Sequence, residues 1–429
     1  MKSFLLRTRP ARNVPAPRRS PAARMSAPVL REVGMPFTEW MLVGVLSLAC
    51  FISISQPLFG VQLHHSILNH FPLMLMLLAM AFHLAGLAMN RQLVPWQTLF
   101  SIWPLIVLGL FALVGSLVAK YELQEKDSYL SFAIYMLLIP LYIGCIAHRT
   151  PHLRSWAVAL ISVWLLTSLA ALAGEVLRAG AQGSLHEIEY LVSVGFLVLY
   201  YVSRGSALKL LALTLLLASA LLNHKLTGYI IAAMAILHIV GAAGWRRLPR
   251  TWKPAYSVAA LVATLVVAGV LALLYFEFRE FLPSGNAEVR LSQYQAVWSQ
   301  FVRSPIWGYA YLAGSGEDYR EYTRLLNIPT HSDVLDLLKH GGVIALVLFA
   351  WGYVKIFLII NRAVVESRAD RVLNAYFLGA RFFQVTAFVT FSINPLLLKG
   401  PYLLVIWANL GLAVGLALAL RRQATSGGA

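Results

Sequence analysis

Apolar runs of about 20 residues recur along the whole 429-residue sequence. A helix needs about 20 apolar residues to span the hydrocarbon core of a bilayer, so each run predicts one transmembrane helix. Only 12% of the residues are charged, against about a quarter in a soluble domain. We therefore expect an all-α polytopic membrane protein with about 12 transmembrane helices. The predicted spans are 38–58, 71–89, 99–119, 129–147, 156–176, 188–203, 206–223, 226–243, 255–276, 335–360, 372–391 and 402–420.

The distribution of Lys and Arg supports this count, because cytoplasmic segments of membrane proteins hold an excess of positive charge. With a cytoplasmic N-terminus, 22 of the 35 Lys and Arg residues fall on the inner side and ten on the outer side. Lys339, Lys355 and Arg381 fall within spans. The net charge of +17 thus reflects topology, and no nucleic acid is expected as a partner. We predict a multi-pass protein of the bacterial inner membrane with both termini in the cytoplasm.

The chain divides into five parts by composition. Residues 1–36, rich in Arg, Pro and Ala, predict a disordered basic cytoplasmic tail that touches membrane lipids. Residues 37–276 hold the first nine spans, 335–420 hold the last three, and 421–429 form a cytoplasmic tail. Residues 277–334 predict one large periplasmic loop containing amphipathic helices. Ordered loops of this length are usually functional, so reactive residues are expected there.

An amphipathic helix is predicted within this loop, over 287–304. Pro305 ends it, and the helix would lie along the membrane surface. Its predicted apolar stripe consists of Leu291, Tyr294, Trp298 and Phe301.

His331 lies where the loop meets the tenth predicted span. Ser332 or Asp333 is a good N-cap and Asp336 falls in the first turn, so a helix should begin here. The positive end of that helix disfavours an imidazolium at His331, and a neutral imidazole is what a general base requires. The alternative is that His331 packs or hydrogen-bonds at the start of the helix.

Arg290 and Lys225 are the candidate phosphate contacts on the outer face. Arg290 opens the amphipathic helix, and a guanidinium binds phosphate oxygens in a bidentate manner. Its alternative role is that of an interfacial arginine that extends to solvent. Lys225 lies in a short outer turn, where it either contacts phosphate or serves as an ordinary interfacial anchor.

Arg381 differs because it falls near the middle of the eleventh predicted span, where a charge is costly and usually functional. An anionic ligand such as a lipid diphosphate would balance its charge. Hydrogen bonds to helix-terminal carbonyls, or to Asn374 or Asn394, are the alternative, and the sequence leaves both open. In the tenth span, Gly341 and Gly342 predict close contact between helices.

No metal or other cofactor is expected. His64, His65 and His70 form an outer cluster without an acid at ligand spacing, and the sequence has no Walker loop and no dinucleotide fingerprint. A donor substrate would then have to arrive through the membrane or from outside.

Over about 285–350 the sequence resembles the O-antigen ligase and O-antigen polymerase superfamily (the WaaL/Wzy type). The resemblance rests on the order of Arg290, the segment Ser304-Pro305-Ile306-Trp307-Gly308, the segment Thr330-His331-Ser332-Asp333 and the pair Gly341-Gly342. It implies an inverting, metal-independent membrane glycosyltransferase that takes a glycan from undecaprenyl diphosphate. The family's loop arginine corresponds to Arg290 and its loop histidine to His331.

The resemblance also implies a second arginine near 225–229, where this sequence has Leu226. Lys225 or Arg381 would take its place as a diphosphate contact. The implied partners are an undecaprenyl-diphosphate-linked glycan and an acceptor, either lipid A–core or another lipid-linked glycan. O-antigen ligation to lipid A–core is the favoured function in lipopolysaccharide biosynthesis, and an O-antigen or exopolysaccharide polymerase using the same site is the alternative. A secondary transporter is disfavoured, because no carboxylate falls at a span midpoint to carry coupling protons.

Overall fold

The structure is a computed structural model, and every regular element in the residues it describes is a helix. The helices are α1 (Phe37–Phe59), α2 (Ile67–Met89), α3 (Trp96–Leu99), α4 (Trp103–Val118), α5 (Leu123–Ile146), α6 (Leu153–Leu177), α7 (Glu189–Val202), α8 (Ser206–Asn223), α9 (Leu226–Arg247), α14 (Asp333–Glu366), η4 (Ser367–Ala369), α15 (Arg371–Ile393) and α16 (Gly400–Ser426). The residues described are 35–59, 67–92, 94–118, 123–147, 152–177, 188–223, 226–247, 294–295, 297–308, 332–393, 396 and 400–426.

Eleven of the twelve predicted spans contain one of these helices, and the span predicted at 255–276 lies outside the described residues. Within the described part, seven helices are long and apolar enough to cross a membrane, and four shorter apolar helices accompany them. The described part of the chain is therefore all-helical and is that of a polytopic membrane protein, as predicted. Lys225, Arg290 and His331 lie outside the described residues, as does the tail up to residue 34.

The third predicted span is divided into a short helix, α3, and a longer one, α4. Pro104 explains the break, because it has no backbone N–H to donate to the carbonyl of Phe100. That carbonyl accepts instead from Trp103, across 3.1 Å. The axis of α4 can then change direction while its first turn remains hydrogen-bonded.

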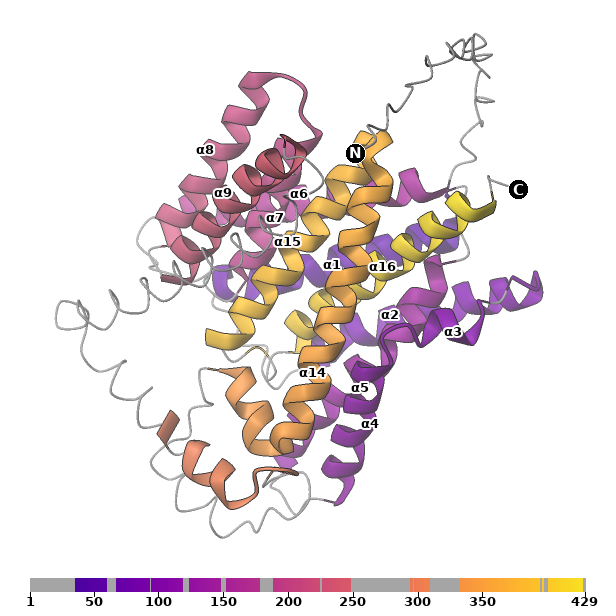
Figure 1. Ribbon diagram of the computed structural model, residues 1–429, viewed down its shortest axis with the longest axis vertical. Coiled ribbons are helices and arrows are strands. Elements are labelled where there is room, and N and C mark those ends of the chain that lie inside the picture. Colours follow the sequence, from indigo (N-terminus) through magenta and orange to yellow (C-terminus); the bar gives the residue numbers. More distant parts are fainter. Residues whose placement is uncertain are drawn as a thin grey trace, which may run out of the picture. The chain divides into compact units, whose positions relative to one another are not determined.

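Helix α16 lies at the centre of the bundle, and every residue from Pro401 to Ala417 is buried. It packs against α5, α14 and α1, which come from distant parts of the sequence (Figure 1). Trp407 is fully buried and stacks on Phe391 of α15, with ring centroids 6.0 Å apart. The core of the bundle is thus built around the last helix of the chain.

Hydrogen bonds show which ends of helices α7, α14 and α15 lie together. The Arg371 Nε at the start of α15 donates to the carbonyl of Tyr201, near the end of α7, across 3.3 Å. Asn374 Nδ2, also in the first turns of α15, donates to the carbonyl of Val364 near the end of α14, across 2.8 Å. Helices α7 and α14 therefore end where α15 begins, and we call this the basic end of the bundle.

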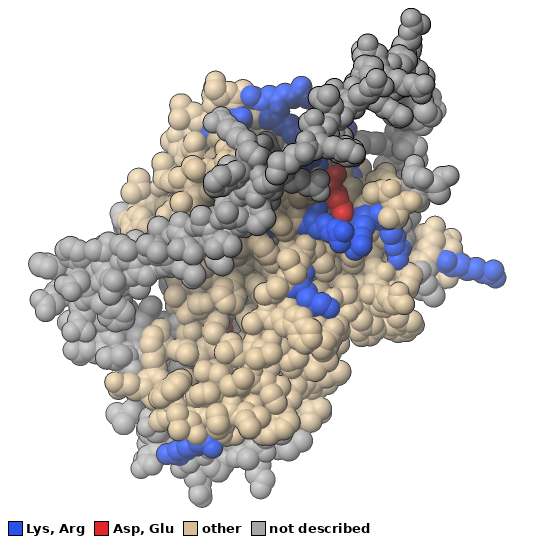
Figure 2. Space-filling view, viewed as in Figure 1, with Lys and Arg blue, Asp and Glu red and all other residues tan. Residues whose placement is uncertain are grey.

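The basic end takes its name from its Lys and Arg residues, among them Arg204, Arg362, Arg368 and Arg371. Figure 2 shows Lys and Arg gathered mainly toward one end of the visible face, beside a broad region without charged side chains. The opposite end, where α14 begins, is called here the loop end. This segregation agrees with the charge distribution predicted from the sequence.

Candidate active site

Ser332 caps α14 at the loop end. Its Oγ accepts from the backbone N–H of Leu335 across 3.4 Å, and its carbonyl accepts from the N–H of Asp336 across 3.0 Å. The helix begins at Asp333, so the prediction of a capped helix start is confirmed, with Ser332 as the cap. His331 directly precedes this cap in the sequence and lies outside the described residues.

Asp333 ties this helix start to the rest of the bundle. Its side chain is 1% exposed, and its Oδ2 accepts from the backbone N–H of Leu396 across 2.7 Å. Leu396 lies in the connection between α15 and α16. A hydrogen bond to an ionised carboxylate is among the stronger ones, so the start of α14 is held against a second connection at the loop end.

The long loop contacts α14 through a turn at 304–308, which we call the loop turn. It follows a helical segment at 297–303, the loop helix, and Ser304 begins the turn as predicted from Pro305. The N–H of Val343 donates to the carbonyl of Pro305 across 2.9 Å, and the N–H of Ile344 donates to that of Ile306 across 3.4 Å. The loop turn is thereby bonded to the backbone of a membrane helix.

This bonding requires α14 to be broken at Gly342, whose φ of 63° and ψ of −163° are not helical. In a regular helix the N–H groups of Val343 and Ile344 would donate to carbonyls one turn earlier in α14. The positive φ turns these donors toward the loop, and glycine adopts it without steric cost. The prediction that the glycine pair serves helix–helix contact is wrong for Gly342, which instead contacts the loop turn.

Gly308 is the matching glycine of the loop turn, with a φ of 76°. A Cβ on Gly308 would overlap the backbone of His340 and Gly341, and a Cβ on Gly342 would overlap the carbonyl of Ile306. The two backbones therefore meet without intervening side chains. Lys339 and His340, just before the break, are 8% and 2% exposed, so both lie inside the protein at this junction.

Arg381 is held inside the bundle by two neutral side chains. Its Nε and Nη2 lie 3.2 and 3.0 Å from Nε2 of His238 in α9, and its Nη1 donates to Oδ1 of Asn361 in α14 across 2.9 Å. His238 Nδ1 in turn lies 2.8 Å from the hydroxyl of Tyr201. Because Arg381 only donates, Nε2 of His238 accepts and its Nδ1 carries the proton.

Arg381 thus contacts Asn361 and His238 where the sequence suggested Asn374 or Asn394. Asn394 lies outside the described residues. Asn361 lies about one and a half turns before the end of α14, at the basic end. The guanidinium thus points toward the basic half of the bundle. The role of Arg381 as a diphosphate contact stays a prediction.

Glu189 is a buried carboxylate that the sequence analysis did not single out. It is fully buried at the start of α7, and its Oε1 accepts from the hydroxyls of Ser193 and Ser219 across 3.0 and 2.9 Å. Ser219 belongs to α8, so the carboxylate joins two helices near the loop end. The signal available in the sequence was an acid at the edge of an apolar run.

Of the histidine cluster, His64 and His65 lie outside the described residues.

Residues 190–350 match the family model described as O-antigen ligase. This segment of the chain is similar to the O-antigen ligase family, in agreement with the resemblance to the O-antigen ligase and polymerase superfamily. The similarity indicates a membrane enzyme of the ligase or polymerase type. The matching segment runs from the start of α7 to the first half of α14 and includes the loop turn and the glycine break. No curated protein matches the chain.

Proposed function

We propose that this chain is an inverting, metal-independent glycosyltransferase that moves a glycan from undecaprenyl diphosphate to an acceptor sugar, as an O-antigen ligase acting on lipid A–core. The observation that carries the proposal is the similarity of residues 190–350 to the O-antigen ligase family, since this segment contains both Arg290 and His331. The glycine-to-glycine junction adds support, because it joins the loop that holds Arg290 to the helix that follows His331.

The reaction is proposed to occur at the periplasmic face of a protein with twelve spans. Helices α7, α9 and α14 all run toward the basic end: Tyr201 at the end of α7 contacts His238 in the second half of α9. The chain leaves α9 at the basic end and enters α14 at the loop end. The described loop turn also lies at the loop end, and a proposed span at 255–276 followed by a loop at 277–334 fits these two ends. Because Lys and Arg mark the cytoplasmic side, the loop end faces the periplasm.

Arg290 is assigned to the diphosphate of the donor, where a guanidinium can bind two phosphate oxygens and stabilise the charge that develops on the leaving group. Lys225 is the second contact that we favour, because the sequence places it next to α9 at its loop end. Arg381 is the weaker candidate, since its hydrogen bonds go to Asn361 and His238 in the basic half of the bundle.

His331 is assigned as the general base. It accepts the proton of an acceptor hydroxyl while the hydroxyl oxygen bonds to the anomeric carbon. The bond from that carbon to the diphosphate oxygen breaks, and undecaprenyl diphosphate leaves with the electron pair. A single displacement inverts the anomeric centre, and the cap at Ser332 fixes the start of the helix behind the base.

The test is to delete the gene, restore it with variants, and analyse the glycans. Loss of a ligase leaves full-length polymer on the lipid carrier, whereas loss of a polymerase leaves single repeat units on the core. His331→Ala should abolish transfer with unchanged protein level in the membrane, while Ser332→Ala, which removes the cap and keeps the imidazole, should lower transfer only in part. Normal transfer by His331→Ala would remove the base role. Arg290→Ala should also abolish transfer, and Arg303→Ala in the same loop serves as its control.

A further inference from the structure

The loop helix has three different faces. Val297 and Gln300 are 3% and 5% exposed, so this face packs onto the protein. Trp298 and Val302, one turn apart, are 60% and 58% exposed and form an apolar face. Ser299 and Arg303 are exposed on the polar face next to it. The predicted stripe thus differs from the structure: Trp298 points outward, and Val297 replaces it on the packed side.

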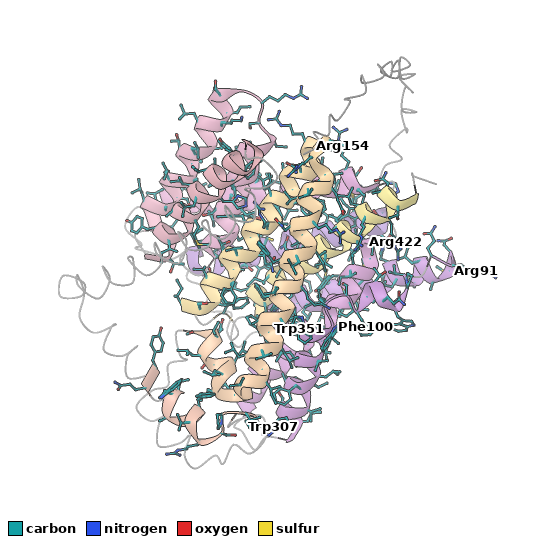
Figure 3. All side chains as sticks on the ribbon, in the orientation of Figure 1. Arg91, Phe100, Arg154, Trp307, Trp351 and Arg422 are labelled. Carbon is teal, nitrogen blue, oxygen red and sulfur yellow. The ribbon has the colours of Figure 1, made fainter. Side chains whose placement is uncertain are left out.

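The apolar face continues through the loop turn. Ile306 is 58% exposed and Trp307 is 50% exposed, four and five residues after Val302 in the chain. Figure 3 places Trp307 and Arg154 at opposite ends of the view, with Trp307 at the loop end. Four large apolar side chains are therefore presented together beyond the first turns of α14. Soluble surfaces rarely carry contiguous apolar patches of this kind without a partner.

The same surface is continuous with the outer stripe of α14. That stripe consists of Val343, Val347, Trp351 and Val354, which are 44%, 52%, 47% and 53% exposed at helical spacing. Val343, the residue of this stripe nearest the loop end, donates its N–H to the carbonyl of Pro305. Because α14 is a membrane span, this stripe meets lipid, and the loop turn extends it toward the headgroups.

We propose that the loop helix lies in the membrane interface at the loop end, with Trp298, Val302, Ile306 and Trp307 inserted into the lipid and Ser299 and Arg303 facing water. Tryptophan is enriched at this depth of the bilayer, and the long side chain of Arg303 can reach phosphate or solvent from there. The helix then sets the depth of the loop in the bilayer. This surface is independent of the catalytic assignments.

The test uses the full-length chain in vesicles of phosphatidylethanolamine and phosphatidylglycerol. Val302→Cys and the matched control Ser299→Cys are each labelled with a nitroxide, and relaxation by oxygen is compared with relaxation by a water-soluble nickel complex. The unsubstituted chain is the blank, because Cys50 and Cys145 are fully buried. Ile306→Cys and Arg303→Cys form a second pair, in case the first pair does not accumulate.

We expect oxygen to relax the label at position 302 more than the nickel complex does. At position 299 we expect the nickel complex to relax the label more than oxygen does. Preferential relaxation by nickel at both positions would place the apolar face in water and overturn the proposal. Protection of the label at Val302 from both reagents would mean that protein covers the face, which also overturns it. Because no glycan is present, failure of the proposed transfer reaction cannot produce either result.

Discussion

The backbone N–H of Val343 donates to the carbonyl of Pro305 across 2.9 Å, joining the long loop directly to a membrane helix. The bond exists because Gly342 breaks α14 and Gly308 lets the loop turn approach within van der Waals contact. Both glycines lie in the segment that resembles the O-antigen ligase family. They serve to position the loop, and this explains why the resemblance includes residues without reactive side chains.

Gly342→Ala should lower the stability of the protein and its transfer activity together. A non-glycine residue at this φ costs about 1–3 kcal/mol, and its Cβ would overlap the carbonyl of Ile306. Gly86→Ala is the control, because nothing lies within 4 Å of the added Cβ in α2. The measurement is the midpoint of thermal unfolding in detergent. Equal unfolding midpoints for the two variants would contradict the contact between Gly342 and the loop turn.

Asp333→Ala should destabilise the loop end by about 1–3 kcal/mol, because the buried N–H of Leu396 loses its acceptor. Asp333→Asn keeps an acceptor oxygen and should recover much of the loss. Thermal midpoints of the two variants and the parent chain give the comparison. If Ala and Asn behave alike, the hydrogen bond to Leu396 contributes little.

Arg381→Gln should cost about 1.5–3 kcal/mol, the range for hydrogen bonds to a charged group. The matched control is Arg362→Gln, since the side chain of Arg362 is 62% exposed and pairs with Glu366 across 3.4 Å. Exposed pairs of this kind contribute about 0–1 kcal/mol. A larger loss for Arg362→Gln than for Arg381→Gln would refute the assignment of Arg381 to the bundle interior.

Glu189→Ala should lower the free energy of unfolding by weakening the contact between α7 and α8. The hydroxyls of Ser193 and Ser219 would both lose their acceptor. Glu189→Gln retains an amide oxygen and should be milder. A double-mutant cycle of Glu189→Ala with Ser219→Ala should show a coupling of about 0.5–3 kcal/mol, the range for residues in contact. Additive losses would show that the two side chains do not interact in the folded protein.

The sequence predicted the positions of the helices well, because length and apolarity determine whether a segment can cross a bilayer. It also predicted the cap at the start of α14, which depends on Ser332 and its near neighbours alone. Local features of this kind need no knowledge of the neighbouring helices. The division of the third span was missed, although Pro104 was its available signal.

The contacts between helices could not be predicted in the same way. His238, Asn361 and Arg381 belong to three different helices, and apolar periodicity does not state which helices are neighbours or how each is rotated. The contacting face of the loop helix was also misassigned, because both of its sides carry apolar residues. Only the packing against the protein distinguishes Val297, which is buried, from Trp298, which is exposed.

The central place of α16 has a consequence for biogenesis. Ribosomes deliver a chain from its N-terminus, so the helix that α5, α14 and α1 surround emerges after all of them. The surfaces that contact Trp407 therefore face lipid or one another until α16 has been synthesised. Assembly of the bundle can be completed only after α16 has inserted between these helices, and a chain stopped shortly before Gly400 would lack the helix that fills the centre.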